Sequence, residues 1–254
     1  MKISVCIICQ DEEKNIRACL DSVKWADEIV VVDSGSRDRT VEIAKEYTTR
    51  VIHNPWAGYN AQRMFSIQQA VGEWVLCLDA DERCGPGLAD EIRRAVSNPG
   101  DVQGFYLRRH TFYLGKWVNH SGWYPDWKLR LARRADVKAT GVEPHDRLEV
   151  PGPTRRIRVG NLLHFSYSGL ADHIRTANKF SDVSAGIMAR DGARPCLFKM
   201  VIAPWIKFLE SYFWKLGILD GRVGFVISVV AAFSVFARQT KLWERTRPPR
   251  PEGS

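Results

Sequence analysis

Hydrophobic and polar positions follow two different periods along the first hundred residues. Continuous apolar runs, typical of strands buried on both faces, alternate with stretches in which apolar residues recur at helical spacing. The runs predict strands over residues 3–9, 28–32, 50–53 and 74–78, and the spacing predicts helices over residues 15–23, 39–47, 60–71 and 87–96. This regular alternation predicts an α/β fold in which right-handed crossovers join the strands of a parallel sheet.

Short acidic segments follow three of these predicted strands. They read QDE at residues 10–12, DSGS at residues 33–36 and DADE at residues 79–82. Ligands of open α/β sheets bind beyond the carboxyl ends of the strands. We therefore expect the three segments to converge on one crevice, which is the predicted functional site.

The third segment brings three carboxylates, Asp79, Asp81 and Glu82, directly after a buried strand. Carboxylates this close repel one another. We expect Asp79 and Asp81 to face a divalent cation, Mg²⁺ or Mn²⁺, that removes the repulsion and bridges to a diphosphate. No G-x-G-x-x-G and no Walker sequence offers another phosphate site, which argues against a Rossmann dehydrogenase. A solvated loop is the alternative, and Asp33 at a neighbouring strand end counts against it.

Composition and charge narrow the class of partner. The 254 residues are 45% hydrophobic and 26% charged, as in one large folded domain or a domain with an appendage. Residues 1–100 hold 12 Lys/Arg and 16 Asp/Glu, whereas residues 101–254 hold 25 and 13. The basic second part predicts an anionic partner, and composition alone leaves nucleic acid, a membrane surface and a phosphorylated substrate open.

Three motifs carry a resemblance to a known family. In order along the chain they are SVCIICQDEEKNI, VVVDSGSRDRTVEIA and AQRMFSIQQAVGEWVLCLDADE. They resemble the N-terminal half of family 2 glycosyltransferases of GT-A fold, which are inverting enzymes that use nucleotide-sugar donors. The later segments YPDWKLRLARR, GVEPHDRLEV and LLHFSYSGLADHI look like the subgroup similar to lipopolysaccharide inner-core β-1,4-glucosyltransferases. The resemblance implies a GT-A, Rossmann-like, mostly parallel sheet with helices on both faces, followed by a C-terminal helical appendage.

Roles in donor and metal binding follow from the resemblance where the motifs match. Asp33 would bind the uracil of a UDP-sugar, and Asp79 would lie near the ribose. Asp81 would hold the divalent cation, and His164, at the end of an apolar run, would be a further metal ligand or else a structural histidine. Two more residues are expected beside the donor, namely Glu12 and Arg63, although the family usually has Asn where this chain has Met64.

The acceptor side is predicted from residues 104–131, which are dense in aromatic and basic side chains. Sugars stack on aromatic rings, so an acceptor groove is expected from Trp117, Trp123, Tyr124, Asp126 and Trp127. Aromatic residues interleaved with basic ones also fit single-stranded nucleic acid, and packed strands are a further alternative. Because no nucleic-acid-binding module is recognisable, we expect no nucleic-acid partner.

Inversion at a sugar carbon needs a base that takes the proton of the acceptor hydroxyl. Asp146 matches the family's acid position, although relatives tend to read V-H-E where this chain reads Pro144-His145-Asp146. We predict Asp146 as the base, with His145 orienting it or the acceptor. A turn carboxylate paired with Arg147 is the alternative reading of Asp146, and Asp126 is the second candidate base.

The C-terminal part is apolar and basic. Residues 196–219 carry three lysines in an apolar stretch, and residues 223–237 are uncharged. Fifteen residues fall short of the roughly 20 that span a bilayer, so helices lying in the membrane interface are predicted. A hairpin packed on the catalytic domain, or on a second copy in a homo-oligomer, is the alternative. The expected domains are a catalytic domain over 1–195 (nucleotide-sugar half 1–100, acceptor half 101–195), membrane-associating helices over 196–244 and a flexible tail over 245–254.

These features together predict a metal-dependent inverting glycosyltransferase. It would move a hexose, glucose by the resemblance, from a UDP-sugar to a lipid-linked saccharide such as the lipopolysaccharide inner core. Its expected location is cytoplasmic, peripheral on the inner face of the cytoplasmic membrane. Two alternatives remain open: the same fold acting on polyprenyl phosphate, exopolysaccharide or protein, and a non-catalytic membrane-binding module, which the intact acidic motifs count against.

Overall fold

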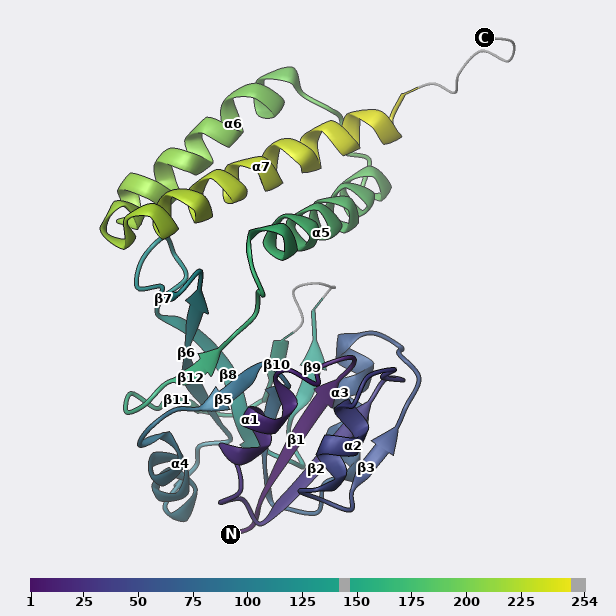
Figure 1. Cartoon of the computed structure of the whole chain (residues 1–254), viewed down its shortest axis with the longest axis vertical. Coiled ribbons are helices and arrows are strands. Elements are labelled where there is room, and N and C mark those ends of the chain that lie inside the picture. Colours follow the sequence, from purple (N-terminus) through teal and green to yellow (C-terminus); the bar gives the residue numbers. More distant parts are fainter. Residues whose placement is uncertain (142–146, 248–254) are drawn as a thin grey trace. The chain divides into compact units, whose positions relative to one another are not determined.

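The structure is a computed structural model and describes residues 1–141 and 147–247. The chain forms two compact units. The first comprises Met1–Phe112 and Pro125–Ser166, and the second comprises Tyr113–Tyr124 and the chain from Tyr167 onward. Figure 1 shows that the central sheet belongs to the first unit and the long C-terminal helices to the second.

The predicted parallel sheet is present in the first unit. Its parallel part has the order β3-β2-β1-β4. These strands are β1 (Ile3–Cys9), β2 (Glu28–Asp33), β3 (Val51–His53) and β4 (Trp74–Asp79). Every residue of β1 is buried, which explains why its sequence is apolar except at Ser4 instead of alternating.

The sheet continues beyond β4 with strands from the second half of the unit. The order is β4-β8-β6-β12-β5, and β11 pairs with β6. The strands are β5 (Glu82–Cys84), β6 (Gly104–Tyr113), β8 (Asp126–Arg133), β11 (Thr154–Arg156) and β12 (Leu162–His164). β8 is antiparallel to both β4 and β6, a feature that the repeating pattern of the first hundred residues did not predict.

Helices cover both faces of the parallel strands, because alternate residues of a strand point to opposite sides. Val5 and Ile7 of β1 share a hydrophobic cluster with residues of α1, α2 and α4, whereas Cys6 shares another cluster with Ile67 of α3. Cys9 falls in the first of these clusters, so Cys6 and Cys9 belong to different faces. The helices are α1 (Ile16–Asp21), α2 (Thr40–Lys45), α3 (Tyr59–Gln69) and α4 (Leu88–Ser97).

A small antiparallel ladder lies beside α3. It consists of β9 (Lys138–Thr140) and β10 (Arg147–Glu149), paired so that Leu148 lies opposite Ala139. The amide of Asn60 at the start of α3 donates to the carbonyl oxygen of Gly141 at 2.8 Å. This ladder flanks the segment 142–146, which contains His145 and Asp146 and lies outside the described residues.

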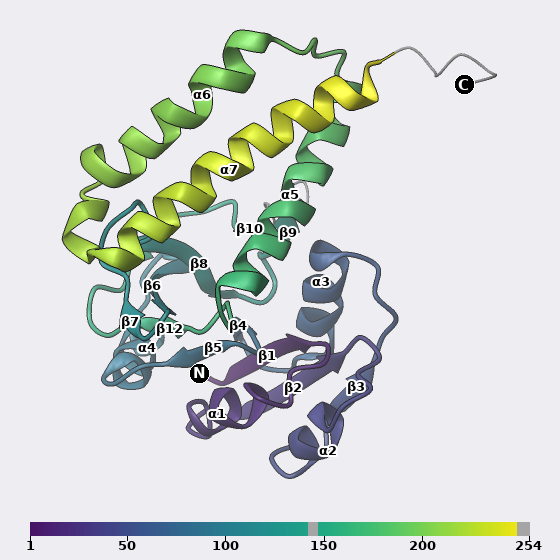
Figure 2. The ribbon, with the colours of Figure 1, turned by 45° about the horizontal axis from the view of Figure 1, so that its top comes forward.

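The second unit is built around three long helices, which lie side by side in both ribbon views (Figures 1 and 2). They are α5 (Leu170–Arg190), α6 (Leu197–Leu209) and α7 (Arg222–Arg245). A π-helical turn (Glu210–Trp214) and a short 3₁₀ helix (Gly217–Asp220) connect α6 to α7. This connection is tight, because a Cβ at Gly224 would lie 1.9 Å from the carbonyl oxygen of Gly217.

This division differs from the expected boundary at residues 195 and 196. α5 belongs with the C-terminal helices because its side chains bind those of α7: Lys241 donates to Asn178 Oδ1 at 2.9 Å, and Arg245 pairs with Asp182 at 2.9 Å. The uncharged run 223–237 is also only part of a longer helix. Among the described residues α7 alone is long and apolar enough to cross a membrane, with a mean hydropathy of 1.6 over a window that is 33% buried.

Candidate functional site at the carboxyl edge of the sheet

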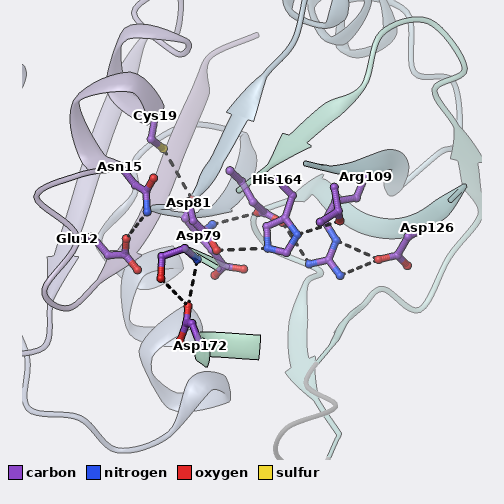
Figure 3. A network of polar contacts seen from close by, with 12 residues as sticks. Glu12, Asn15, Cys19, Asp79, Asp81, Arg109, Asp126, His164 and Asp172 are labelled. Atoms are coloured by element: carbon purple, nitrogen blue, oxygen red, sulfur yellow. Dashed lines mark hydrogen bonds and ion pairs between the residues drawn. The ribbon is translucent and has the colours of Figure 1, made fainter. Parts of the chain in front are cut away.

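The three acidic segments meet at one edge of the sheet because of the strand register. Cys9 at the end of β1 lies opposite Asp33 at the end of β2, and Ile8 lies opposite Asp79 at the end of β4. The chain therefore leaves all three strands side by side, and Figure 3 shows Glu12, Asp79 and Asp81 in one neighbourhood. The expected convergence is what the structure shows.

Asp33 closes the turn that follows β2. It is 4% exposed, and its Oδ2 accepts hydrogen bonds from the backbone N–H groups of Gly35 at 2.9 Å and Ser36 at 3.0 Å. The hydroxyl of Ser36 also donates to Oδ1. Gly35 has a φ of +97°, which a residue with a side chain rarely adopts. The DSGS motif thus builds a tight, self-bonded turn that presents Asp33 at the edge of the sheet.

Glu12 lies just before α1 and is held at both its backbone and its side chain. Its N–H donates to Thr40 Oγ1 at 2.7 Å, and Asn15 Nδ2 donates to its carboxylate at 2.8 Å. Burial raises the pKa of Glu12 to about 7; the hydrogen bond from Asn15 lowers it, and the carboxylates of Asp81 and Asp79 contribute to the rise. The raised pKa thus reflects burial first, and then the negative charge gathered at this edge.

Asp79 is paired with arginines, which corrects the expectation that it faces a cation together with Asp81. Arg63 Nη2 of α3 lies 2.8 Å from its Oδ1, and Arg130 Nη2 of β8 lies 2.7 Å from its Oδ2. Burial alone would raise the pKa of Asp79, but the charges of Arg63 and Arg130 outweigh burial and hold this pKa well below its ordinary value. Asp79 is therefore ionised, and Arg63 and Arg130 offset its negative charge.

Glu82 is the fully buried member of the acidic segment, and sequence reasoning assigned it no role. Its Oε1 accepts a hydrogen bond from Arg130 Nη2 at 2.8 Å and lies 3.6 Å from Arg109 Nη1 of β6. Its Oε2 accepts from the backbone N–H of Asp79 at 3.1 Å. Buried charges require such partners. The repulsion among the carboxylates is thus relieved largely by arginines.

Arg109 and Arg130 are the functional candidates that sequence reasoning missed. Both are strand residues on β6 and β8, and both bind carboxylates of the acidic segment. The sequence offers one signal for Arg130, which interrupts the apolar run of the segment KLRLA. A buried strand carries a cation only where a buried acid pairs with it.

Asp81 faces His164, the pair that the resemblance assigned to the metal. His164 Nε2 lies 3.3 Å from Asp81 Oδ2, and both side chains are mostly buried (Figure 3). The position of His164 follows from strand pairing, because β12 places it opposite Glu82 of β5 and opposite Thr111 of β6. The Thr111 hydroxyl lies 3.3 Å from His164 Nδ1, and this contact forms with either tautomer of the ring because a hydroxyl both donates and accepts.

This pair fits a cation that a ligand helps to hold. Among the described residues, no three His, Cys, Asp or Glu side chains form a group that could hold a metal ion. Magnesium, however, is usually bound by one or two protein side chains together with substrate phosphates and waters. Asp81 and His164 supply two such ligands, so the residues fit a cation shared with a diphosphate and do not fit a closed protein cage.

The predicted acceptor residues fall into both units. Asp126 and Trp127 belong to β8 in the first unit, where Asp126 Oδ2 accepts hydrogen bonds from Arg109 Nε at 2.9 Å and Nη2 at 2.7 Å. Trp117 of β7 (Lys116–Trp117), Trp123 and Tyr124 belong to the second unit. There Trp123 packs with Tyr113, Tyr167 and His173 in an aromatic cluster.

Comparison with known proteins identifies the family of the chain. Residues 4–148, more than half of the chain, match the family described as Glycosyl transferase family 2. An uncharacterized glycosyltransferase of Rickettsia typhi (strain ATCC VR-144 / Wilmington) is 30% identical over 96% of this chain and 87% of its own length. The chain is therefore a glycosyltransferase. It belongs to glycosyl transferase family 2.

Two further proteins are similar to this chain, one in sequence and one in fold. The lipopolysaccharide core biosynthesis glycosyltransferase LpsC of Rhizobium meliloti (strain 1021) is 29% identical over 96% of this chain and 93% of its own length. The mannosyltransferase PcManGT of Pyrobaculum calidifontis, solved with GDP-Man and Mn²⁺, superposes with a TM-score of 0.55 over 97% of this chain and 88% of its own, at 15% identity. At that identity the likeness concerns the fold, and it confirms the GT-A architecture.

Proposed function

We propose that this enzyme transfers a hexose, glucose, from a UDP-sugar to a lipid-linked saccharide of the lipopolysaccharide inner-core type, with inversion and with the help of a divalent cation. The observation that carries the proposal is the pair formed by Asp81 and His164, which lies beside the arginine-bound Asp79 at the carboxyl edge of the sheet. The similarity to LpsC, whose name states a role in lipopolysaccharide core biosynthesis, supports this acceptor class.

Asp81 Oδ2 and His164 Nε2 would hold Mg²⁺ or Mn²⁺. When bound, the cation offsets the charge of the donor diphosphate and of the leaving nucleotide. The protein contributes orientation: the Thr111 hydroxyl contacts His164 Nδ1 at 3.3 Å, and the backbone N–H of Phe165 donates to the carbonyl oxygen of Asp81 at 2.9 Å. On the nucleotide side, Asp33 and Glu12 would position the uridine, and Arg63 would keep Asp79 ionised near the ribose.

The proton of the acceptor hydroxyl would be taken by Asp146, an assignment that comes from the sequence because Asp146 lies outside the described residues. The second candidate, Asp126, is less suited to the task. Its Oδ2 is held by two N–H groups of Arg109, and its Oδ1 lies 3.3 Å from Lys128 Nζ. Protonation would disrupt these charge-assisted contacts, so Asp126 fits a positioning role better than that of a base.

The decisive experiment combines donor hydrolysis with binding. UDP-glucose, UDP-galactose, UDP-N-acetylglucosamine and GDP-mannose would be screened for Mn²⁺-dependent hydrolysis, and UDP binding would be measured by calorimetry with and without EDTA. Asp81→Asn should abolish metal-dependent UDP binding, whereas Asp90→Asn, an exposed carboxylate on α4, should leave it unchanged. Full transfer in EDTA, or full activity of Asp81→Asn, would contradict the proposal.

A membrane surface would present the lipid-linked acceptor, and the second unit has a face suited to it. α6 is strongly apolar, yet none of its residues is buried. Trp205 is 67% exposed and Trp214 is 88% exposed, and Lys199 of α6 and Arg222 of α7 are exposed as well. Aromatic rings with nearby cations favour the interface of an anionic bilayer. We place the enzyme on the inner face of the cytoplasmic membrane, where UDP-sugars are present.

The helices would lie in the interface and not cross the bilayer. α7 is flanked by α5, which carries Asp182 and Arg175, and the ion pair from Arg245 to Asp182 joins the two helices. A crossing α7 would bring this polar helix into the hydrocarbon, where charges are costly. α6 and the amino-terminal half of α7 instead share an apolar groove of about 650 Å³ that opens on the exposed face.

Liposome flotation tests this part of the proposal. The full chain should float with vesicles of phosphatidylglycerol and phosphatidylethanolamine. The double variant Trp205→Glu/Trp214→Glu should not, while Trp56→Glu, an exposed tryptophan of the first unit, serves as the matched control. A wild-type chain that never floats but forms a salt-resistant dimer would show that this face is an interface between two copies instead.

A further inference from the structure

A second cavity in the first unit lies next to the acidic edge but is lined mainly by cations. It has a volume of about 300 Å³ and is bordered by α3, β6, β8 and β10. Of the described residues that line it, one is acidic, Asp79, and five are basic: Arg63, Arg109, Lys128, Arg130 and Arg147. Three of them, Arg63, Arg109 and Arg130, already bind the carboxylates of Asp79, Asp126 and Glu82. The two more exposed cations, Lys128 and Arg147, have no role assigned above.

Four of the five cations fall into two kinds, and Arg109, whose side chain is 21% exposed, lies between them. Arg63 and Arg130 are 4% and 6% exposed and are held firmly by Asp79 and Glu82. Lys128 and Arg147 have side chains that are 42% and 71% exposed, and their carboxylate partners are at the surface. Surface ion pairs contribute little, typically 0–1 kcal/mol. Lys128 and Arg147 can therefore turn to an incoming anion at small cost, whereas the charges of the buried arginines are offset by Asp79 and Glu82.

The cavity also offers aromatic surface. Tyr106 of β6 and Trp127 of β8 are among its lining residues, and Arg156 lies 5.1 Å from the centroid of the Trp127 ring. Rings of this kind accept the apolar face of a sugar, and a cavity of about 300 Å³ is at the lower end of the usual size for small-molecule sites. Aromatic rings next to exposed cations favour a sugar ring that carries an acidic group.

We propose that this cavity binds an acidic sugar of the acceptor, one that carries a carboxylate or a phosphate, with Lys128 and Arg147 contacting the anionic group. The inference rests on the proposed function, since it names the substrate class of the same site. Arg147 directly follows Asp146, the residue assigned as base, in the sequence. The same anion chemistry is present in the donor diphosphate, and the experiment has to separate these two sources.

The first arm measures binding without catalysis. D-glucuronate, D-glucose 6-phosphate and neutral D-glucose are compared by saturation-transfer NMR with the full chain. The two acidic sugars should bind, glucose should bind more weakly, and Lys128→Gln/Arg147→Gln should weaken the acidic sugars by about tenfold or more, because each lost charged contact accounts for roughly that factor. Lys138→Gln, an exposed cation of β9 that does not line the cavity, is the matched control.

The second arm separates acceptor from donor. In the double variant the Kd for UDP-glucose and the rate of donor hydrolysis should stay within about twofold of wild type. The proposal is overturned if neither acidic sugar binds the wild-type chain, if the double variant binds them as well as wild type, or if the variant instead weakens UDP-glucose, which would assign the cavity to the diphosphate. Failure of the proposed function appears differently, as absent donor hydrolysis in a wild-type chain that still binds acidic sugars.

Discussion

The two units depart from the usual distribution of side chains in opposite ways. In the first unit charged groups are buried: Glu82 is fully inaccessible, and Arg63 and Arg130 are nearly so. In the second unit large apolar groups are exposed, with Trp214 and Leu197 the most accessible at 88% and 75%. Soluble domains seldom show either feature without a function. The difference contrasts a unit that buries ion pairs with a unit that exposes a large apolar surface.

The largest effect is expected at Arg130, which binds both Asp79 and Glu82 and therefore tests the buried charges of the first unit. Arg130→Met leaves both carboxylates short of a buried partner and should lower the free energy of unfolding by roughly 3–5 kcal/mol. Urea denaturation measures this, with Lys128→Met, two residues earlier on β8 and partly exposed, as the control. The double variant Arg130→Met/Glu82→Gln should recover part of the loss. Unchanged stability of Arg130→Met would mean that the buried ion pairs contribute nothing.

The next largest effect concerns the base. Asp146→Asn should lower kcat by at least ~10²-fold with donor binding unchanged, because general base catalysis typically supplies ~10²–10⁴-fold. Asp126→Asn should mainly raise the KM for the acceptor, since it loosens Arg109 and Lys128. Steady-state kinetics with donor and acceptor varied separately distinguish the two. An inactive Asp126→Asn beside a near-normal Asp146→Asn would exchange the two roles.

Several polar side chains of the second unit are buried, and one of them, His173, is bonded to Tyr113 with 2.9 Å between Nδ1 and the hydroxyl oxygen. Burial lowers the pKa of His173 to about 4, although Asp172 opposes this. The unfolded chain, with a pKa near 6.5, therefore binds a proton first as the pH falls. The contribution of neutral His173 to stability is complete above about pH 6.5 and is lost as the pH falls from there towards 4.

Thermal unfolding at pH 7.5 and pH 5 tests this dependence. The wild-type midpoint should fall on acidification, and His173→Gln should fall less. His53→Gln, which changes an exposed histidine of the first unit, should keep the wild-type pH dependence. Equal slopes for wild type and His173→Gln would show that another group is responsible.

The smallest effect on stability is expected at the exposed apolar face. Trp205→Gln/Trp214→Gln should change the free energy of unfolding by no more than about 0.5 kcal/mol per residue, as surface substitutions usually do. Ile227→Ala, at a position of α7 that is 1% exposed, should cost about 2–5 kcal/mol. Denaturation of both variants compares exposed and buried apolar residues of one unit. A large loss at the tryptophans would mean that they pack within the folded chain.

The sequence by itself determined the layered α/β architecture of the first unit and the meeting of its acidic segments. Apolar runs such as Ile3–Cys9 can only be strands covered on both faces, and parallel strands bring their carboxyl ends to a common edge. The local pattern was therefore sufficient to place Asp33, Asp79 and Asp81 together. It also predicted apolar C-terminal helices, although α5 joined them in the structure because of polar contacts with α7.

Only the tertiary structure decided how the charges of that edge are balanced. Arg130 lies 51 residues from Asp79 and 48 from Glu82, and it meets them because β8 inserts antiparallel between β4 and β6. A D-x-D sequence cannot tell whether a cation or a guanidinium will relieve the repulsion of its carboxylates, since the partner comes from a distant strand. Coulomb energy in a buried site depends on separations of a few ångströms. Strand pairing sets those separations. It brings Asp81 into contact with His164, and it brings Asp79 and Glu82 into contact with the arginines.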